Sequence, residues 1–313
     1  MQHLKTLRYV DLAARLGSIR KAADALHMAS TAVNRSILAL ERELGAELFE
    51  RLPRGVRLTA AGEIFVHHAR QVGADLDRVR SEIEDLKGLR RGTVSIAAIE
   101  AATSSILPAA IRRFQTHYPR VQFQVTLAGT EQIIAGVTTD EFDIGIILNP
   151  PPHADLTTNF AAEQRLHAVM SRTHPLARHS SLHLHQCLEH PLAIADSSKG
   201  GRRMLDQMLH RAGLRIRPAI VSNSFQLMEI FCVEGGGIFF QLEIGARRPQ
   251  IRKALTAIPL ADRGAVGRLV IATRRGRPPT VAAAAFVEAL KDELAQPAPP
   301  GRMSGAKRAP LRA

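Results

Sequence analysis

Residues 17–63 read GSIRKAADALHMASTAVNRSILALERELGAELFERLPRGVRLTAAGE, and this stretch decides the fold of the N-terminal region. Ser18 is placed to cap a short helix over residues 19–26, whose alanines form an inward face. A turn at His27 leads into a second helix over about residues 31–44, where apolar side chains recur at helical spacing. Two short helices that meet through alanines across a tight turn are typical of a helix-turn-helix, an element that binds DNA.

The segments on either side complete a small, mostly α-helical domain. Before the quoted stretch, apolar residues between Leu4 and Ala14 can share one buried stripe of a helix that ends before Gly17. After the second helix, the segment LFERLPRGVRLT at 48–59 predicts two short strands around a Pro-Arg-Gly turn, which is a wing with exposed arginines. The sequence therefore predicts a winged helix-turn-helix domain over residues 1–58.

A long helix is predicted next, from Thr59 as its N-cap to about Lys87. Its apolar residues recur every three or four positions, which is the seam of a helix that pairs with another helix. At 1.5 Å per residue the helix extends about 40 Å, too far for the small N-terminal domain to cover. A second copy of the chain is the natural partner, and a spacer that rests on its own chain is the alternative. Within this linker of residues 59–91, the candidate dimerisation residues are Phe65, Val72, Leu76, Val79, Ile83 and Leu86.

From residue 92 onward, strands and helices alternate. Three strands and two helices between Val94 and Leu148 form a βαβαβ unit, which predicts a parallel sheet with one helix from Ser104 to Tyr118. A second set follows, and it contains the strand LHAVMS and a helix near Arg203. Two similar α/β halves in one chain predict two lobes around a cleft for a small ligand.

These patterns divide the remainder of the chain into two lobes and a tail. The two-lobed region is predicted over 92–295, with the strand GRLVIAT and an Ala-rich helix over 280–294 closing the fold. The final segment is rich in Pro and has four basic residues and no acidic one, so we expect a disordered basic tail. The predicted ranges are 92–164 with 268–295 for lobe I, 165–267 for lobe II and 296–313 for the tail.

The composition limits the class of protein. The 313 residues are 45% apolar, which is enough for real cores and more than one domain. The formal net charge of +13 favours a polyanionic partner, while the absence of Trp argues against RNA or single-strand binding by base stacking. The two cysteines, Cys187 and Cys232, exclude a disulfide framework and fit a reducing cytoplasm. We find no signal peptide and no long apolar run, so we expect neither export nor a membrane span.

Five segments together resemble the LysR-type transcriptional regulators along nearly the whole chain. They are GSIRKAADALH, AVNRSILALERELGAELFER, RLTAAGE, FDIGI and SRTHPLA, in the order and at the distances typical of that family. The resemblance implies a winged helix-turn-helix, a linker helix that dimerises, and an α/β effector domain of two lobes similar to periplasmic binding proteins. It also implies a bacterial cytoplasmic regulator at the nucleoid, whose partners are double-stranded DNA, a small-molecule effector, further copies of itself and RNA polymerase.

The second helix of the helix-turn-helix is the candidate reader of base edges in the major groove. The family positions fall on Ser30, Thr31, Asn34 and Arg35. Arg35 can bind guanine or a phosphate, and Asn34 can pair with adenine or approach a phosphate, and the sequence leaves these alternatives open. Where the family usually has Ser, Gln and Ser, this chain has Ala29, Ser30 and Asn34. We therefore expect that the helix cap has moved to Ser30 or Thr31.

The wing supplies the second set of candidate DNA contacts. Its arginines are expected to hold phosphates, and the one at the tip, Arg54, is best placed to reach the minor groove. For Arg57 a solvated side chain is the alternative. The candidate wing contacts are Arg51, Arg54 and Arg57.

The resemblance places effector contacts in loops that follow the strands of lobe I and in facing loops of lobe II. Thr103, Ser104 and Thr130 stand at predicted helix starts, where hydroxyls and free N–H groups suit a carboxylate or phosphate, so we expect an anionic effector. Each of the three can instead be only an N-cap. An inward Glu100 favours a ligand that also carries an amine or hydroxyl, and a solvent-facing carboxylate is the alternative. The candidate effector-binding residues are Glu100, Thr103, Ser104, Thr130, Asn149, Ser197, Ser198 and Asn223.

Other segments indicate no further chemistry. HLHQCLEH at 183–190 holds three histidines and Cys187, but these do not share one helix face, so we expect no metal site. EGGGIFF at 234–240 lacks the features of a phosphate loop or a dinucleotide fingerprint, and we find no nucleophile with its base, so we expect no cofactor and no enzyme. Gln241 stands where the family often has Pro, which leaves the local backbone open. The rival interpretations are a DNA-binding domain fused to an enzyme-like or transport-type module, and an architectural protein that binds DNA through bulk charge.

Overall fold

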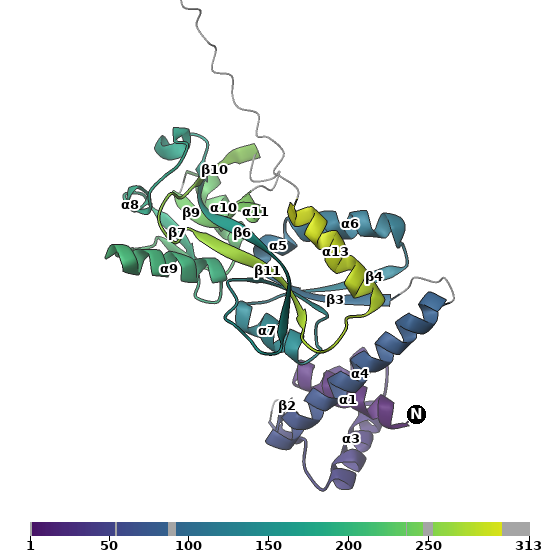
Figure 1. Cartoon of the computed structure of the whole chain (residues 1–313). Coiled ribbons are helices and arrows are strands. Elements are labelled where there is room, and N and C mark those ends of the chain that lie inside the picture. Colours follow the sequence, from purple (N-terminus) through teal and green to yellow (C-terminus); the bar gives the residue numbers. More distant parts are fainter. Residues whose placement is uncertain (1, 54, 87–91, 236, 247–252, 296–313) are drawn as a thin grey trace, which may run out of the picture.

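The computed structural model has a helical domain at one end, a long helix that leads away from it, and an α/β region of two lobes (Figure 1). No described helix is both long and apolar enough to cross a membrane. The predicted tail of 296–313 lies outside the described residues. The structure describes residues 2–53, 55–86, 92–235, 237–246 and 253–295.

The N-terminal domain is the predicted helix-turn-helix with a two-stranded antiparallel wing. Ser18 caps the second helix, because its Oγ accepts a hydrogen bond from the backbone N of Lys21 at 3.3 Å. The inward alanines of that helix pack with Val33 and Ile37 in one core. The elements are α1 (Gln2–Leu16), α2 (Ile19–Ala25), α3 (Ser30–Leu44), β1 (Phe49–Leu52) and β2 (Gly55–Leu58).

The start of α3 differs from the prediction. Its N-cap is Ala29, which makes no side-chain capping bond, and the helix already begins at Ser30. The expectation that Ser30 or Thr31 caps α3 is therefore wrong, because both residues already lie within the helix. The N-cap residue itself has extended backbone, as Ala29 does. The turn before α3 is tight because His27 adopts a left-handed backbone, with φ of 53°. The first N–H groups of α3 thus have no side-chain acceptor from a cap.

The long helix α4 begins as predicted. Thr59 caps it, since Oγ1 of Thr59 accepts a hydrogen bond from the backbone N of Gly62 at 3.0 Å. Gly62 lies against the wing so closely that a Cβ at this position would be 2.0 Å from the carbonyl oxygen of Leu48. The glycine therefore allows α4 to start directly behind the wing. The helix spans Ala60–Leu86.

A buried carboxylate joins α3 to the wing. Glu41 is 8% exposed, and its Oε1 accepts hydrogen bonds from the backbone N of Leu48 at 2.8 Å and of Phe49 at 3.2 Å. Without this acceptor, two N–H groups at the start of β1 would be buried and unsatisfied. Glu41 therefore fixes the wing relative to α3.

One mixed sheet runs through both lobes, and the sequence predicted parallel pairing for its βαβαβ unit over residues 94–148. Among the described residues its order is β4-β3-β5-β11-β6-β9-β7-β8, with β10 paired to β6. The outer parts are parallel as predicted, since β3 pairs with β4 and β5, and β7 pairs with β8 and β9. β11, whose direction the sequence did not indicate, is antiparallel to both β5 and β6, so the sheet is mixed. The strands are β3 (Gly92–Ala98), β4 (Val121–Leu127), β5 (Ile144–Leu148), β6 (Leu156–Ser171), β7 (Leu192–Ala195), β8 (Ile220–Ser222), β9 (Ile238–Leu242), β10 (Leu255–Pro259) and β11 (Val266–Arg274).

The strands β6 and β11 connect the lobes. β6 is 16 residues long, pairs with β11 along its first part, and pairs with β9 and β10 along its second part. Only the second part, LHAVMS, was predicted, because polar residues in the first part hide its strand pattern. We call β3–β5, α5–α7 and α13 the first lobe, and β7–β10 with α8–α11 the second lobe. The helical segments are α5 (Glu100–Thr103), α6 (Ile106–His117), α7 (Thr130–Thr138), η1 (Pro175–Arg178), α8 (Leu184–Cys187), α9 (Gly200–Ala212), α10 (Phe225–Val233), α11 (Glu243–Ala246) and α13 (Val281–Ala295).

Helices cover the sheet of the first lobe on both faces (Figure 1). α6 and α13 lie together on one face, where the rings of Phe114 and Phe286 pack edge to face at 5.3 Å. α7 lies on the other face, with Ile133 and Val137 fully buried. The predicted helix from Ser104 in fact begins at Ile106. The short α5 and the start of α7 are the parts of the first lobe that line the pocket facing the second lobe.

Candidate functional site

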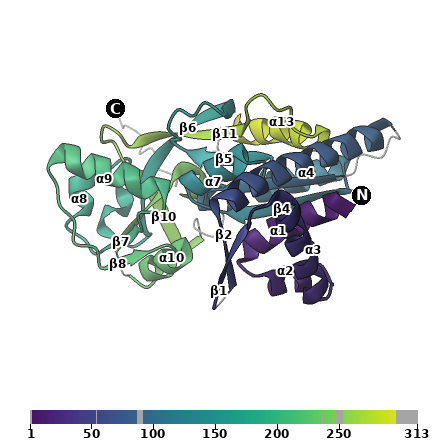
Figure 2. The ribbon, with the colours of Figure 1, turned by 90° about the horizontal axis from the view of Figure 1, so that it is seen from below.

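The outer face of the helix-turn-helix presents polar side chains. Ser30, Thr31 and Arg35 are exposed on the first turns of α3, and Asn34 is half-buried. Arg35 has no ion-pair partner within the described part of the chain. Figure 2 shows the wing strands projecting beside α2 and α3. A free first turn on the second helix, with a wing beside it, is the geometry that places a helix in the major groove.

The wing arginines differ in their partners. Nη2 of Arg51 donates a hydrogen bond to Oδ1 of Asn34 at 3.0 Å, which joins the wing to α3. Nε of Arg57 is 3.0 Å from Oε2 of Glu50 on the neighbouring strand, so a carboxylate neutralises its charge. Arg54 lies outside the described residues. The structure thus brings Arg51 and Asn34 together, a contact that the sequence did not indicate.

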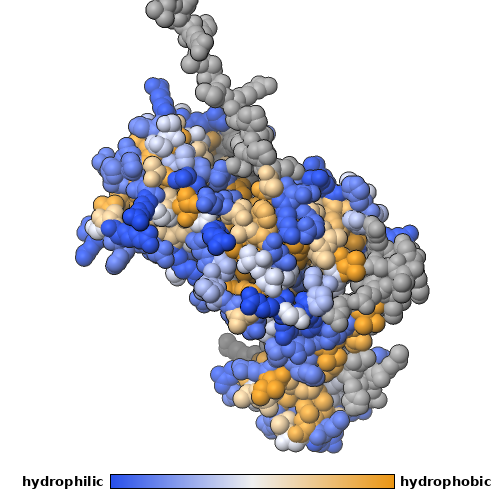
Figure 3. All heavy atoms as spheres, viewed as in Figure 1, coloured by the Kyte–Doolittle hydropathy of each residue, from blue (hydrophilic) through white to orange (hydrophobic). Residues whose placement is uncertain are grey.

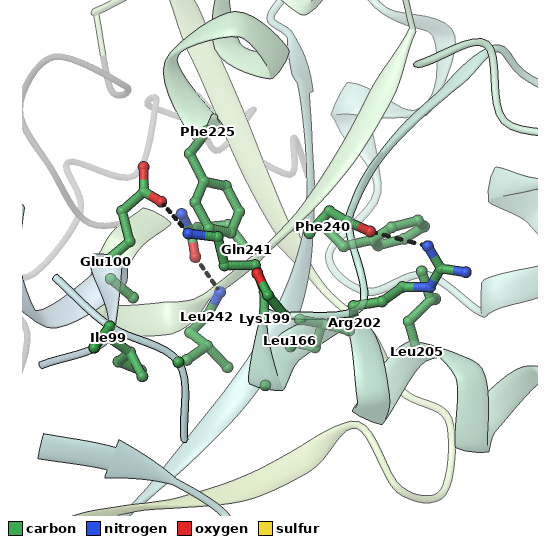
Figure 4. Close-up of a pocket in the computed structure, with 17 residues that line it drawn as sticks. Ile99, Glu100, Leu166, Lys199, Arg202, Leu205, Phe225, Phe240, Gln241 and Leu242 are labelled. Atoms are coloured by element: carbon green, nitrogen blue, oxygen red, sulfur yellow. Dashed lines mark hydrogen bonds and ion pairs between the residues drawn. The ribbon is translucent and has the colours of Figure 1, made fainter. Parts of the chain in front are cut away.

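A pocket lies between the lobes, beside the carboxyl ends of β3 and β7. It encloses about 570 Å³ of empty space, part of which is open to solvent. Its charged groups are Glu100 from α5 of the first lobe and Lys199 and Arg202 from the second lobe (Figure 4). Most of its wall is apolar. The larger apolar side chains are Ile99, Leu166, Leu205, Phe225, Phe240 and Leu242.

An ion pair crosses this pocket from one lobe to the other. Nζ of Lys199 is 3.0 Å from Oε2 of Glu100, and both side chains are about one-fifth exposed. Arg202 instead finds its partners within the second lobe, because Nη1 donates to the carbonyl oxygen of Ala195 at 2.9 Å and Nε pairs with Asp206 at 2.7 Å. Lys199 is therefore the pocket cation whose partner belongs to the opposite lobe.

The first turn of α7 also touches the second lobe. A Cβ on Gly129, the N-cap of α7, would lie 3.1 Å from the carbonyl oxygen of Ser198. Glu131 is the second residue of α7, and its Oε1 lies 3.9 Å from Nη1 of Arg203 on α9. The lobes are thus in close contact at the start of α7 as well as through the ion pair.

Some predicted effector residues reach the pocket and others do not. Glu100 and Ser198 line it. The hydroxyls of Thr103 and Ser104 both donate to the carbonyl oxygen of Glu100, at 2.9 and 2.8 Å, so they end α5. The prediction that these two residues stand at a helix start is wrong. Thr130 does begin α7, is 2% exposed, and its Oγ1 has no hydrogen-bond partner among the described residues.

The remaining three predicted residues lie elsewhere. Oδ1 of Asn149 accepts a hydrogen bond from the backbone N of Arg268 at 2.7 Å, so this side chain joins the end of β5 to β11. The left-handed backbone of Asn149, with φ of 47°, turns the chain there. Ser197 and Asn223 are exposed and do not belong to the described lining of the pocket.

Along α4, the predicted seam divides into covered and open residues. Phe65 packs against the core of the N-terminal domain, and Val72 and Leu76 are half-buried. Val79 is 45% exposed and Ile64, which the seam did not include, is 74% exposed. Figure 3 shows apolar side chains gathered on the N-terminal domain at the foot of α4. The side chains of Ile83 and Leu86 lie outside the described residues.

Charged side chains join the N-terminal domain to the first lobe. Arg70 of α4 lies 2.7 Å from Asp11 of α1 and 3.4 Å from Glu141, which follows α7. Arg15 of α1 contacts the same two carboxylates, at 2.9 Å from Asp11 and 3.8 Å from Glu141. These four residues form a continuous network from α1 through α4 to the loop after α7.

A second group next to this network holds the middle of α4. Asp140, whose side chain is 7% exposed, accepts hydrogen bonds from Arg274 and Arg277. Nη2 of Arg277 also donates to the carbonyl oxygen of Gln71 at 2.6 Å and pairs with Asp75 at 2.8 Å. We call the two groups together the junction: Asp11, Arg15, Arg70, Asp75, Asp140, Glu141, Arg274 and Arg277.

Two family models match the chain. Residues 4–63 match the bacterial regulatory helix-turn-helix protein, lysR family, and residues 87–295 match the LysR substrate binding domain. The chain belongs to the LysR family. It is a DNA-binding transcriptional regulator with an effector-binding domain, and not an enzyme.

Relatives and solved structures agree with this assignment. The HTH-type transcriptional regulator YdcI of Escherichia coli K12 is 29% identical over 278 residues, covering 88% of this chain and 89% of YdcI. The RuBisCO operon transcriptional regulator of Allochromatium vinosum is 25% identical over 299 residues, covering 94% and 97%. Full-length OxyR from Pseudomonas aeruginosa has a TM-score of 0.69, at 21% identity over 93% of this chain and 94% of that one. CbnR in complex with its target DNA has a TM-score of 0.63, at 21% identity over 93% and 99%.

In this LysR-family regulator, the sequence did not point to Lys199, Arg202 or Gln241 as pocket residues. The helix near Arg203 was placed too late, because α9 already starts at Gly200 with Lys199 as its N-cap. A lysine between a strand end and two glycines was the available signal. Gln241 is 2% exposed inside the apolar strand β9, and its Oε1 accepts a hydrogen bond from the backbone N of Leu242 at 2.9 Å. A single amide in an apolar strand was a second signal.

The cysteines of this regulator are buried, and burial raises the pKa of the Cys187 and Cys232 thiols to about 12. Such thiols are inert at neutral pH because the thiolate is the reactive form. His174 and His190 stack edge to face at 4.5 Å, and burial together with His190 lowers the pKa of His174. In the part of the chain that the structure describes, no three His, Cys, Asp or Glu side chains are grouped as metal ligands.

Proposed function

We propose that this LysR-family regulator binds a small anion with an apolar body in the pocket, and that binding is transmitted through α7 to the linker helix. The observation that carries the proposal is the ion pair between Lys199 and Glu100, which spans the two lobes inside a mostly apolar wall. It supplies both a cation for the ligand and a contact that the ligand can replace.

Lys199 is the proposed anion-binding group. A carboxylate or phosphate that displaces Glu100 keeps Lys199 paired, while the apolar wall accepts the rest of the ligand. An opened pocket without ligand would leave a partly buried cation uncompensated, which is unfavourable. Gly129, the N-cap of α7, lines the pocket. Thr130 is the first residue of this helix, and its Oγ1 has no hydrogen-bond partner among the described residues. The positive end of the α7 dipole, next to Gly129, adds to the preference for an anion.

α7 is the proposed connection between the pocket and the DNA-binding domain. Its first turn touches the second lobe through Gly129 and Glu131. Just past its last turn, Asp140 and Glu141 belong to the junction that holds α1 and α4. A change in lobe closure therefore acts on one end of a short, rigid helix and reaches the linker at its other end. The ligand shifts the population between two arrangements by its different affinity for them.

A second copy of the chain is the proposed partner of α4, as a dimer or within a tetramer. The exposed Val79 and Ile64 leave apolar surface on the linker, and the edge strands β4 and β8 expose Val125 and Val221. We place the action of the protein on double-stranded DNA at the bacterial nucleoid, with RNA polymerase as a further partner. We also propose that the DNA-binding domain ends at residue 58, the linker at residue 91 and the two-lobed domain at residue 295.

Calorimetric titration of the full-length protein tests the ligand class. The probes are small aliphatic and aromatic carboxylates, inorganic phosphate, and the neutral amides of the same acids. We expect a carboxylate to bind and its amide not to bind, Lys199→Ala to abolish binding, and Glu100→Gln to tighten it. Lys253→Ala removes an exposed lysine of the second lobe and serves as the control. Amides that bind as well as acids, or unchanged binding by Lys199→Ala, would contradict the proposal.

A footprint on the DNA beside the gene of the protein tests the transmission. With the bound carboxylate present, we expect the protected region to change in length or in bend-induced hypersensitive sites, more than the affinity changes. An unchanged footprint with a saturated pocket would refute transmission and leave ligand binding intact.

A further inference from the structure

The contact between Asn34 and Arg51 fixes how the asparagine is oriented. Asn34 lies on the fifth position of α3, and Nη2 of Arg51 on β1 is 3.0 Å from its amide oxygen. An arginine has only N–H donors, so this bond can be made only to Oδ1 and never to Nδ2. The amide therefore turns its oxygen toward the wing and leaves its NH2 group for an outside partner.

We infer that Asn34 and Arg51 read DNA as one unit that offers only hydrogen-bond donors, and so select guanine rather than adenine at the base facing Asn34. The inference rests on the DNA-binding function of the family and deepens it. Guanine presents two acceptors, N7 and O6, in the major groove, while adenine presents N7 and an amino donor. An asparagine recognises adenine with both its NH2 and its oxygen, and Arg51 already occupies the oxygen.

The second lone pair of Oδ1 does not restore adenine recognition. The guanidinium of Arg51 fills the wing side of this oxygen, and its positive charge opposes an amino donor at the same base edge and favours a carbonyl oxygen. Arg51 is thus a positioning residue for Asn34, in addition to any phosphate that its other N–H groups bind. The cytosine amino group is disfavoured for the same reason.

Arg57 provides a matched comparison on the same wing. It is exposed like Arg51, but it pairs with Glu50 and, within the described residues, makes no hydrogen bond or ion pair with α3. Loss of either arginine removes one positive charge from the wing and weakens binding to every sequence through the phosphates. Only the loss of Arg51 also frees the oxygen of Asn34.

Selection from a random duplex DNA library with full-length protein tests the inference. Asn34→Ala identifies the position that Asn34 reads, as the position whose base preference disappears. We expect the wild type to prefer guanine over adenine there by about tenfold, because a wrong base pair in a binding site typically weakens binding by about this factor. Arg51→Ala is expected to accept adenine about as well as guanine at this position, and Arg57→Ala is expected to keep the wild-type preference.

Several results would overturn the inference. Adenine preferred by the wild type at the Asn34-dependent position would do so, as would an Asn34→Ala variant that keeps every preference. An Arg51→Ala variant that loses affinity like Arg57→Ala but keeps guanine would reduce Arg51 to a phosphate contact. A wild type that selects no sequence would instead overturn sequence-specific DNA binding itself, which distinguishes the two failures. Equal thermal unfolding of the two arginine variants confirms that both are folded.

Discussion

The proposed DNA-binding surface and the pocket between the lobes hold their polar groups in opposite ways. On α3, Ser30, Thr31 and Arg35 remain in water and need no partner within the chain. In the pocket and the junction, Lys199 and Asp140 are largely removed from water and are paired with opposite charges. An exposed surface whose polar groups are hydrated binds its partner by adding contacts. A pocket whose charges are already paired must exchange one contact for another, and in the proposed function this exchange is the switch.

The strongest test of this contrast concerns the packing that holds the exposed surface in place. Gly62→Ala puts a Cβ about 2.0 Å from the carbonyl oxygen of Leu48, so α4 and the wing must separate. We expect a loss of about 4 kcal/mol or more in the stability of the N-terminal domain, and loss of DNA binding. Thermal unfolding by circular dichroism and a DNA-binding titration measure both effects.

Gly73→Ala on the same helix is the matched control, because a Cβ there has no neighbour within 4 Å in the described chain. It is expected to stabilise the helix by up to about 1 kcal/mol, since alanine is the better helix former. If both variants melt alike, the wing is not held by close contact with α4.

The next test removes the buried acceptor beneath the wing. Glu41→Ala leaves the N–H groups of Leu48 and Phe49 without Oε1, and we expect a loss of about 3 kcal/mol. Glu41→Gln keeps an oxygen in the same place and is expected to cost about 1 kcal/mol at most. Denaturant titration of the two variants compares them. Equal losses would show that the charge, and not the acceptor, holds the wing.

The third test addresses the paired charges of the junction. Asp140→Asn keeps the left-handed backbone, which asparagine tolerates, but leaves Arg274 and Arg277 facing a neutral group. Removing one partner of a buried pair costs several kcal/mol, and we expect about 2 kcal/mol here because Asp75 still pairs with Arg277. The DNA footprint should also change without ligand, since α4 loses part of its hold on the first lobe.

Asp292→Asn is the control for this test. Asp292 is 67% exposed and 3.9 Å from Arg113, a surface pair of little value. Its melting temperature and footprint should match those of the wild type. A junction variant that behaves like this control would show that the DNA-binding domain is not held by these charges.

The sequence predicted the exposed region better than the pocket, and the reason is the distance along the chain between partners. The caps Ser18 and Thr59 each bond a backbone N–H three residues away, so local rules were sufficient to identify them. Ala29 is the local exception, because α3 begins after it without any side-chain capping bond.

The pocket depends on contacts that no local rule describes. Glu100 and Lys199 are 99 residues apart, and their pairing follows from how two lobes close on each other. The same holds for β11, which enters the sheet antiparallel between β5 and β6 after more than 90 residues of intervening chain. The hydroxyls at 103 and 104 were misassigned because a short helix, α5, ends there instead of a longer one beginning. The alternation of strands and helices predicted the two lobes, and only the structure showed the ion pair between them.

The smallest expected effect concerns His174 of the second lobe, which is half-buried and so intermediate between the exposed surface of α3 and the buried charges of the junction. Burial and the neighbouring His190 lower the pKa of His174 in the folded protein below the usual 6.5. The unfolded chain therefore takes up a proton at a higher pH than the folded one, so this residue's contribution to stability is present above about pH 6.5 and is lost as the pH falls toward the folded pKa.

His174→Asn removes the titration but keeps an acceptor for the backbone N of Leu176, which Nδ1 of His174 now binds at 3.2 Å. We expect the melting temperature of this variant to fall less than that of the wild type between about pH 7 and pH 5.5, and to match it at higher pH. Replacing the exposed His179 by Asn is the control, and identical pH profiles for all three proteins would show that half-burial of His174 has no energetic consequence.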